Sequence, residues 1–406
     1  MTGTSFDPFV ATPRPKSKTE EVCVFDTRVV AGRGGGPDKT ILNSPRFLAG
    51  SGYRMLCGYL HPPGDQGFAE IERKASKYQA PLISIPDRGP WDWRVLKELL
   101  AVCKREKVAI WHGHDYKTNA LGLILKKIWP MRLVTTVHGW VHHTSRTPLY
   151  YKIDRMCLPR YERVISVSED LVEECRKAGV KPEKNLLLEN AIDTDEYSRS
   201  LLPAVAKAKL GLPADGLLIG ACGRLENEKA FDLLIRSVKT VRDRGQNVRL
   251  VILGEGGDRR RLEGVIADCG LKAVVLLSGW QSDVIRWYEA MDLFALSSLR
   301  EGLPNVLLES MAMGVPTIAT RIAGIPKLLE HEVNGLLVPA GDQDALTSAL
   351  LRLTVDAELR DELKRAARRT IETRYSFPVR MTKLARIYDD LLQATPGRHP
   401  RGRVED

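Results

Sequence analysis

Short runs of aliphatic and β-branched residues alternate with helical patterns along the chain, and this alternation constrains the fold more than any other feature. It is typical of α/β proteins with parallel sheets. In the first half, the predicted strands are Val22–Asp26, Arg54–Tyr59, Leu82–Ile85, Val108–Trp111, Leu133–Val137, Val164–Val167 and Leu186–Leu188. In the second half, they are Leu217–Cys222, Arg249–Leu253, Val274–Leu277, Leu293–Leu296, Pro316–Ala319 and Leu336–Val338. We therefore predict two Rossmann-like sheets, whose ligands bind beyond the carboxyl ends of the strands.

The length of 406 residues is enough for two domains of ordinary size. The stretch 193–212, with its serines, Pro203 and short Ala/Lys run, is predicted to join them. The predicted division is a disordered lead-in (1–20), an N-terminal domain (21–195), a C-terminal domain (196–375), a last helix (376–395) and a disordered tail (396–406). The lead-in lacks the apolar segment of a secretory signal.

The charge and the cysteines narrow the class of protein. A net charge of +10 favours an anionic partner, such as a phosphorylated substrate or an anionic membrane surface. The basic residues are spread along the chain without a nucleic-acid-binding motif, so no nucleic-acid partner is predicted.

Seven irregularly spaced cysteines indicate reduced thiols, with neither a metal site nor a disulfide framework. No apolar run reaches the roughly 18 residues that span a bilayer. We expect a cytoplasmic protein.

A glycine-rich loop, Gly32-Arg33-Gly34-Gly35-Gly36-Pro37-Asp38-Lys39, follows the first predicted strand and precedes a helix. Glycines let the backbone approach a phosphate closely, and a helix start supplies free N–H groups. Gly35 and Gly36 are therefore candidate ligand contacts. The spacing is neither a Walker A loop nor G-x-G-x-x-G, which disfavours ATP and NAD.

Histidines cluster at the ends of two neighbouring predicted strands. His112 and His114 are two positions apart, so they point to one face of a strand, and His138 ends the next strand. Such a pair is a potential metal site, but no third ligand with suitable spacing follows, so no metal is assigned. The position at strand ends favours a functional role, and the sequence leaves open which of the first two faces the ligand.

Two further segments carry charge at predicted strand ends in the second half. The first segment is Gly223-Arg224-Leu225-Glu226-Asn227-Glu228-Lys229. In it, Arg224 could bind a diphosphate through two guanidinium N–H groups, and Lys229 could bind it as a point charge. Glu301 and Glu309 stand eight positions apart, separated by Gly302, Leu303, Pro304 and the start of a helix. Free N–H groups of Gly302, Leu303 and the first turn would form an anion site, with Pro304 suited to that turn.

The run from Glu301 through Glu309, Ser310, Gly314, Pro316 and Asn334–Val338 resembles the E-x7-E signature of the family 4 (group 1) retaining nucleotide-sugar glycosyltransferases. The segment Gly223–Lys229 resembles the G-R-x-x-x-x-K element of that family, and Gly32–Gly36 resembles the glycine-rich first loop of enzymes with the GT-B fold. The second resemblance implies that the loop reaches toward the donor diphosphate, with Gly35 and Gly36 as donor-binding residues. Asn190–Asp193 is similar to the family's N-G-V-D turn, with Ala191 replacing glycine.

The resemblance implies a GT-B fold, with two Rossmann-like domains facing across a cleft and the last helix crossing back to the first domain. The first domain would hold the acceptor and the second a nucleoside-diphosphate sugar. Glu309 would accept hydrogen bonds from the ribose, Glu301 and the amides after it would hold the sugar, and Arg224 and Lys229 the diphosphate. His114 would lie beside the transferred sugar and His138 on the acceptor side. In the front-face retaining transfer that we expect, the leaving phosphate takes the acceptor's proton. Arg224 and Lys229 would stabilise that phosphate where metal-dependent transferases use a divalent ion, so neither a cofactor nor a metal is predicted.

Alternatives stay open at this point. A nucleotide-sugar epimerase, a glycan phosphorylase or a non-catalytic sugar-nucleotide-binding protein could use the same plan. A double displacement through an enzyme carboxylate is an alternative mechanism, with Glu301 as the first candidate nucleophile and Asp115 as the second. The acceptor is a glycan or a lipid-linked molecule. The apolar segment 117–130 is favoured as a core helix, with peripheral contact to an anionic membrane as the alternative. The donor base and sugar are not readable.

Overall fold

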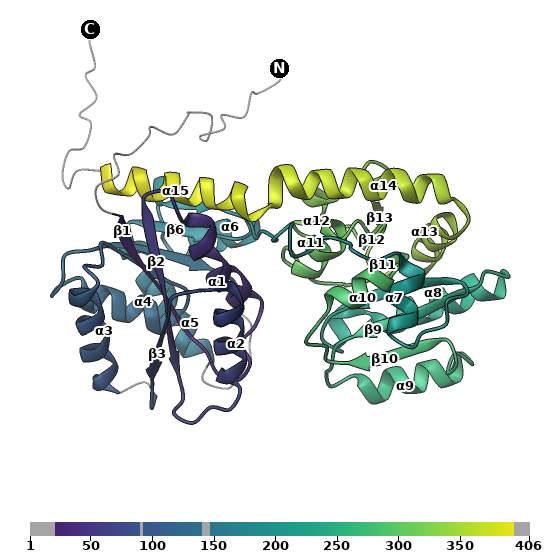
Figure 1. Cartoon of the computed structure of the whole chain (residues 1–406), viewed down its shortest axis with the longest axis horizontal. Coiled ribbons are helices and arrows are strands. Elements are labelled where there is room, and N and C mark those ends of the chain that lie inside the picture. The colour runs from purple at the N-terminus through teal and green to yellow at the C-terminus, as the bar shows by residue number, and fades with distance from the viewer. Residues whose placement is uncertain (1–20, 90–91, 140–146, 394–406) are drawn as a thin grey trace, which may run out of the picture. The chain divides into compact units, whose positions relative to one another are not determined.

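The computed structural model describes residues 21–89, 92–139 and 147–393, and the predicted lead-in and tail lie outside this part. The chain divides into unit 1 (Met1–Leu188 and Pro378–Asp406) and unit 2 (Glu189–Phe377). Each unit is built on one parallel sheet with helices on both faces (Figure 1). The two-sheet α/β prediction is confirmed.

Unit 1 contains a seven-stranded sheet in the order β3-β2-β1-β4-β5-β6-β7. Its strands are β1 (Val22–Val29), β2 (Tyr53–His61), β3 (Leu82–Pro86), β4 (Ile110–Gly113), β5 (Arg132–Val137), β6 (Arg163–Ser166) and β7 (Asn185–Leu187). Its helices are α1 (Gly36–Leu48), α2 (Phe68–Tyr78), α3 (Trp93–Arg105), α4 (Tyr116–Leu125), α5 (Thr147–Cys157), α6 (Glu169–Lys177) and α15 (Phe377–Gln393). The order reverses between β1 and β4, which is where ligands of such sheets bind.

Unit 2 contains a six-stranded sheet in the order β10-β9-β8-β11-β12-β13, with its reversal between β8 and β11. Its strands are β8 (Leu217–Cys222), β9 (Val248–Leu253), β10 (Val275–Gly279), β11 (Leu293–Leu296), β12 (Thr317–Thr320) and β13 (Leu336–Val338). Its helices are α7 (Pro203–Lys209), α8 (Phe231–Asp243), α9 (Arg259–Asp268), α10 (Ile285–Ala290), α11 (Asn305–Ala312), α12 (Ile325–Leu328), α13 (Gln343–Val355) and α14 (Ala357–Thr370).

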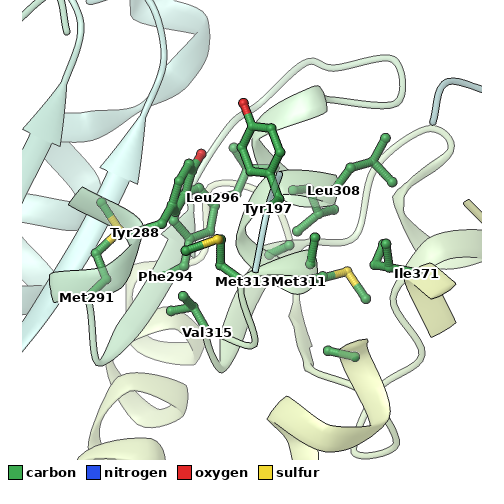
Figure 2. Packing of buried hydrophobic residues seen from close by; sticks show 14 of the residues in the cluster. Tyr197, Tyr288, Met291, Phe294, Leu296, Leu308, Met311, Met313, Val315 and Ile371 are labelled. Atoms are coloured by element: carbon green, nitrogen blue, oxygen red, sulfur yellow. The ribbon is translucent and has the colours of Figure 1, made fainter. Parts of the chain in front are cut away.

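Alternation along the strands fills a core on each face of each sheet. In unit 1, Phe25 faces the core shared with α3 and α4, whereas Cys57 and Tyr59 face α1 and α2. In unit 2, Leu250 and Ile252 face α8 and α13, whereas Phe294 faces α10 and α11. Figure 2 shows part of the unit 2 core that contains Phe294, where the rings of Tyr288 and Phe294 have centroids 5.9 Å apart. Because both faces are covered, the strands are apolar along most of their length.

The division between the units differs slightly from the predicted one at residue 195. Residues 189–195 belong to unit 2 because Ile192 pairs with Ser376 and lies in the core around α11. Arg368 of α14 fixes the following turn by donating hydrogen bonds to the carbonyl oxygens of Thr194 and Tyr197. After Phe377 the chain returns to unit 1, where Tyr388 of α15 is buried against His112 of β4.

Helix α4 covers the segment for which two readings were open. Thr118, Asn119, Gly122 and Leu125 are buried, so α4 is a covering helix of the sheet, while Ile124 near its end is exposed. Within the described residues, none of the helices is both long enough and apolar enough to cross a bilayer.

Candidate functional site

In unit 2, a buried ion pair lies at the reversal point of the sheet. The Nζ atom of Lys229 lies 2.5 Å from Oε1 of Glu301, and the two side chains are 12% and 10% exposed. The loop after β8 supplies the lysine, and the loop after β11 supplies the glutamate. Ser298 donates a second hydrogen bond to Oε1 of Glu301 at 2.7 Å. The predicted phosphate-binding lysine and sugar-binding glutamate are therefore direct neighbours.

Backbone contacts join these two loops. The hydroxyl of Ser297 donates to the carbonyl oxygen of Lys229 at 2.8 Å, and the N–H of Leu299 donates to the carbonyl oxygen of Glu228 at 2.8 Å. Thr320, at the end of β12, donates to the carbonyl oxygen of Ser298 at 2.7 Å. The ion pair thus rests on a rigid edge formed by three adjacent strands.

Glycines let the loops at this edge approach one another. A Cβ atom on Gly254, whose φ is +139°, would lie 1.9 Å from the carbonyl oxygen of Gly223. A Cβ atom on Gly223 would lie 3.2 Å from Cε of Lys229, so the absence of a side chain leaves room for the lysine. The glycine-rich segment after β9, Gly254–Gly257, therefore has a packing role beside the Gly223–Lys229 loop.

Arg224 and Glu309 take different positions from the central pair. The Arg224 side chain is 56% exposed and pairs with Glu228 at 2.9 Å within its own loop. Glu309 is 2% exposed on the inner side of α11, where Tyr288 donates to its Oε2 at 2.9 Å. Burial and the nearby Glu309 hold the pKa of Tyr288 well above its usual value, so this tyrosine is a donor. Glu309 thus lies deeper in unit 2 than Glu301.

The segment between the two glutamates forms the entry to α11. Gly302 is exposed, while the Leu303 side chain is buried in the core of unit 2, so Leu303 can offer a ligand only its backbone. Pro304 is the residue that precedes the helix, with an extended backbone, rather than a member of its first turn as predicted. The free N–H groups at this point are therefore those of Gly302, Leu303 and the first residues of α11.

In unit 1, three histidines gather at the reversal point between β1 and β4. The rings of His112 and His114 stack at 4.7 Å, which confirms that they share one face, and His114 stacks on His138 at 5.1 Å. His112 is held inside the unit by Tyr388 and Thr136, each 2.7 Å from one of its ring nitrogens. His114 lies nearer the edge, with Nδ1 at 2.8 Å from Nε2 of His138 and Nε2 in contact with Asp26 of β1.

Burial keeps these histidines neutral. It lowers the pKa of His112 to about 3, and it holds the pKa values of His114 and His138 well below their usual range. Burial has the opposite effect on a carboxyl group, and it raises the pKa of Asp26 to about 6. At neutral pH the cluster therefore contains neutral imidazoles beside one carboxylate.

The glycine-rich loop of unit 1 is fixed by a carboxylate. Asp38 is fully buried, accepts a hydrogen bond from the N–H of Gly35 at 2.5 Å and pairs with Arg28 at 3.0 Å. Gly34 has a φ of +71°, and a Cβ atom there would lie 2.5 Å from Oδ2 of Asp38. The loop is therefore an ordered turn that presents Gly35 and Gly36 at the start of α1, and Asp38 has a structural role.

The sequence did not single out Asp26, Ser298 or Tyr288. Asp26 had a readable signal, since it is a carboxylate inside an otherwise apolar predicted strand.

Asp115, the second candidate nucleophile, caps α4: its carboxylate accepts from the N–H groups of Val29, Lys117 and Thr118. Those bonds occupy both oxygens, which argues against a nucleophilic role.

Asp26, His112 and His114 are metal-binding residue types within 4.8 Å of one another. All four ring nitrogens of the two histidines already contact protein groups, namely Tyr388, Thr136, His138 and Asp26. A cation would have to displace one of these partners, and the nearby Arg28 and Arg380 would repel it. We therefore assign this cluster no metal.

Two protein families match the two halves of the chain. The family described as "Glycosyltransferase Family 4" matches residues 34–196, and the family described as "Glycosyl transferases group 1" matches residues 216–356. The first match contains Gly35, Gly36 and the histidine cluster, and the second contains Arg224, Lys229, Glu301 and Glu309.

Known proteins show the same relationship. The lipopolysaccharide core biosynthesis glycosyltransferase LpsD of Rhizobium meliloti is 32% identical over 53% of this chain and 60% of its own length, so the match spans less than two thirds of that relative. An Escherichia coli UDP-Gal:α-D-GlcNAc-diphosphoundecaprenol α-1,3-galactosyltransferase is 28% identical over 74% of this chain and 80% of its own length. The crystal structure of Anabaena HepE in complex with UDP has the same fold, with a TM-score of 0.75 and 20% identity over 91% of this chain and 100% of HepE. This chain therefore belongs to the group 1, family 4 glycosyltransferases and has their GT-B fold.

Proposed function

We propose that this glycosyltransferase moves a hexosyl group from a nucleoside-diphosphate sugar to a hydroxyl of a glycan or lipid-linked acceptor, in the synthesis of a surface polysaccharide or glycolipid. The observation that carries this proposal is the Lys229–Glu301 pair at the reversal point of the unit 2 sheet. The relatives named above support it, since one acts in lipopolysaccharide core synthesis and another on a diphosphoundecaprenol-linked sugar.

The donor would lie along the carboxyl edge of unit 2. Lys229 and Arg224 would face the diphosphate, because ammonium and guanidinium groups stabilise charge that develops on a leaving phosphate. Glu301 already binds Lys229 and Ser298 through Oε1, and its other oxygen would accept a hydrogen bond from a sugar hydroxyl. Gly302, Leu303 and Pro304 would line the sugar through their backbone, and Glu309 would serve the ribose.

The transfer would retain the configuration of the anomeric carbon and require no metal. In this scheme, the acceptor oxygen bonds to the anomeric carbon on the face from which the diphosphate leaves. The proton of the acceptor hydroxyl passes to the departing phosphate oxygen, and the positive charges of Lys229 and Arg224 stabilise the diphosphate. In unit 1, His114 would lie beside the transferred sugar and His138 on the acceptor side, both as neutral imidazoles, since the pKa values of both lie well below the usual range.

Product analysis tests this function. The purified protein is incubated with UDP-, GDP- and ADP-sugars, with and without glycan and lipid-linked acceptors, and the products are identified by mass spectrometry. Acceptor-dependent transfer with a retained anomeric configuration, undiminished by a chelator, is the expected result. Arg224→Ala should lower kcat by about 10- to 100-fold, because one charged donor to the leaving group is lost.

Several results would contradict the proposal. Conversion of the donor without acceptor would indicate an epimerase, a requirement for inorganic phosphate would indicate a phosphorylase, and nucleotide binding without turnover would indicate a binding protein. An inverted product, or an Arg224→Ala enzyme with full turnover, would overturn the front-face mechanism. The exposed Arg286 of α10, which pairs with Asp283, offers a control: Arg286→Ala should keep full activity.

We further propose that unit 1 contacts an anionic membrane surface through the outer side of α4 and α5. The two helices pack together, with Tyr116 stacked on Tyr150 at 4.4 Å. Exposed apolar side chains on them or next to them are Ile124, Ile128, Leu149 and Met156. The exposed Lys126 and Lys127 follow α4 directly. Apolar side chains beside lysines are the composition of a membrane-surface contact.

Vesicle sedimentation tests this contact. The protein should bind phosphatidylglycerol vesicles more tightly than phosphatidylcholine vesicles, and Lys127→Glu should weaken that binding about tenfold because it reverses one charge near the bilayer. Lys177→Glu, at the exposed end of α6, makes the same charge change elsewhere. Equal losses in the two variants would show that only net charge matters, and the proposed surface would be wrong.

A further inference from the structure

Three side chains of unit 1 form a chain of direct contacts that ends at the edge of the sheet. Asp26 contacts Nε2 of His114, and Nδ1 of His114 lies 2.8 Å from Nε2 of His138. The side chains of His114 and Asp26 are 4% and 3% exposed. Nδ1 of His114 is hydrogen-bonded to His138, and Nε2 is enclosed against Asp26 in a close contact that lacks hydrogen-bond geometry, so His114 offers a substrate no ring nitrogen.

The contacts also determine where the protons lie. An ionised carboxylate oxygen repels a bare nitrogen lone pair at contact distance, so Nε2 of His114 carries the proton when Asp26 is ionised. Nδ1 of a neutral His114 is then a bare acceptor, and Nε2 of His138 must supply the proton between them. A neutral His138 with a proton on Nε2 has a bare lone pair on Nδ1.

That last nitrogen is open. Nδ1 of His138 has no hydrogen-bond partner among the described residues, and it is not among their fully enclosed unpaired side-chain atoms. His112 shows the contrast, because both of its ring nitrogens are bound, by Tyr388 and Thr136. Of the three stacked histidines, His138 is the one with a nitrogen available at the edge of unit 1.

We propose that Asp26 is a positioning residue which, through His114, sets His138 to accept a hydrogen bond at Nδ1 from a sugar hydroxyl of the substrate. This proposal rests on the proposed glycosyl transfer and adds the group that orients one hydroxyl in unit 1. The hydroxyl belongs to the acceptor or to the transferred sugar. The chemistry is the same in both cases, and the kinetics below distinguish them.

The arrangement gives a pH dependence whose sign follows from Asp26. The groups that face Asp26 are Arg28 on its own strand, Cys57 on β2, His112 and His114 at β4, and Arg380 and Tyr388 on α15. Burial outweighs the arginines and raises the pKa of Asp26 to about 6. Above this pH Asp26 is ionised and His138 accepts. Below it, a protonated Asp26 donates to Nε2 of His114. The protons of His114 and His138 then lie on their Nδ1 atoms, and His138 presents an N–H group instead.

The test compares Asp26→Asn with Tyr388→Phe. Asp26→Asn keeps the shape of the side chain but removes the carboxylate that fixes the proton positions on His114 and His138. Tyr388→Phe removes a buried hydrogen bond to His112, which is not one of the contacts that join Asp26, His114 and His138. We expect Asp26→Asn to raise one KM about fivefold, as for one lost hydrogen bond, with little change in kcat. A rise in the acceptor KM places the hydroxyl on the acceptor, and a rise in the donor KM places it on the transferred sugar. The fall in kcat/KM below about pH 6 should vanish in Asp26→Asn and persist in Tyr388→Phe.

Nitrogen NMR of the eight histidines gives a readout that needs no turnover. His138, assigned by its loss in His138→Gln, should have an unprotonated Nδ1 at pH 7.5 in the wild type and in Tyr388→Phe, and a mixed state in Asp26→Asn. A protonated Nδ1 in the wild type, or an Asp26→Asn protein with unchanged KM values and an unchanged acid limb, overturns the proposal. Absence of transfer in the wild type would instead refute the proposed function. The NMR result would still test whether Asp26 sets the protonation of His138.

Discussion

The two units share one architecture but differ in the chemistry at the edge of the sheet. In both, the candidate groups lie in or just after the strands near the reversal point, which are β1, β4 and β5 in unit 1 and β8 and β11 in unit 2. In unit 2 the central contact is ionic, between Lys229 and Glu301. In unit 1 it joins neutral histidines, whose pKa values burial has lowered, to a single carboxylate.

This difference suits two different parts of a reaction. Fixed positive charge stabilises a diphosphate, whose charge grows as it leaves, whereas neutral ring nitrogens bind hydroxyl groups without attracting a second phosphate. The Rossmann-like sheet supplies the same edge twice, and the few residues after its central strands determine what each edge binds.

The largest effect should come from removing the charge in unit 2. Lys229→Ala takes away the cation proposed to face the diphosphate and leaves the buried Glu301 without its ionic partner. We expect kcat/KM to fall about 1000-fold, or about 4 kcal/mol of transition-state stabilisation. Steady-state kinetics with the identified donor measure this change. Lys239→Ala removes an exposed lysine that pairs with Asp243 on α8 and should change kcat/KM less than twofold.

A smaller loss would change the comparison between the units. If Lys229→Ala retained a tenth or more of the wild-type kcat/KM, the ion pair would be structural, and unit 2 would hold its ligand mainly through backbone groups. Circular dichroism and thermal unfolding of the variant separate lost catalysis from lost folding, because an unpaired buried carboxylate also lowers stability.

The fold was predictable because local pattern and tertiary structure agree in this chain. Each predicted strand corresponds to an observed one, with ends that differ by a few residues, as for β1, which extends from Val22 to Val29 rather than stopping at Asp26. The strand apolarity that made this possible arises from helices on both faces of each sheet. Pro304 shows the limit, since its fixed φ suits both the first turn and the position before the helix.

The site was less predictable, because its contacts join segments far apart in sequence. Lys229 and Glu301 were both candidates, but their pairing depends on β8 and β11 being neighbours in the sheet. Asp26 reaches His114 only because β1 pairs with β4, and without that pairing it was one carboxylate in an apolar run. Strand order, rather than any local pattern, determines these contacts.

The smallest effects should come from the glycines that shape the two edges, and they too should differ between the units. Gly34 and Gly254 both have positive φ, and a Cβ atom on either would meet another atom. At Gly34 these atoms are the ends of the Asp38 and Ile71 side chains, which shift at lower cost than backbone even though Asp38 is hydrogen-bonded, whereas at Gly254 the nearest is the backbone oxygen of Gly223, at 1.9 Å. Gly254→Ala should therefore lower the free energy of unfolding by about 3 kcal/mol or more, and Gly34→Ala by about 1–2 kcal/mol.

Gly264 provides the control, because it lies within α9 and a Cβ atom there would meet nothing within 4 Å. Gly264→Ala should raise stability by about 0.5–1 kcal/mol, since alanine loses less backbone entropy in a helix. Denaturant unfolding of the three variants tests the order. A Gly34→Ala variant less stable than Gly254→Ala would mean that the loop around Asp38 is the more rigid edge. Unit 1 would then depend on a fixed backbone as strongly as we expect of unit 2, and the difference between the edges would be one of charge alone.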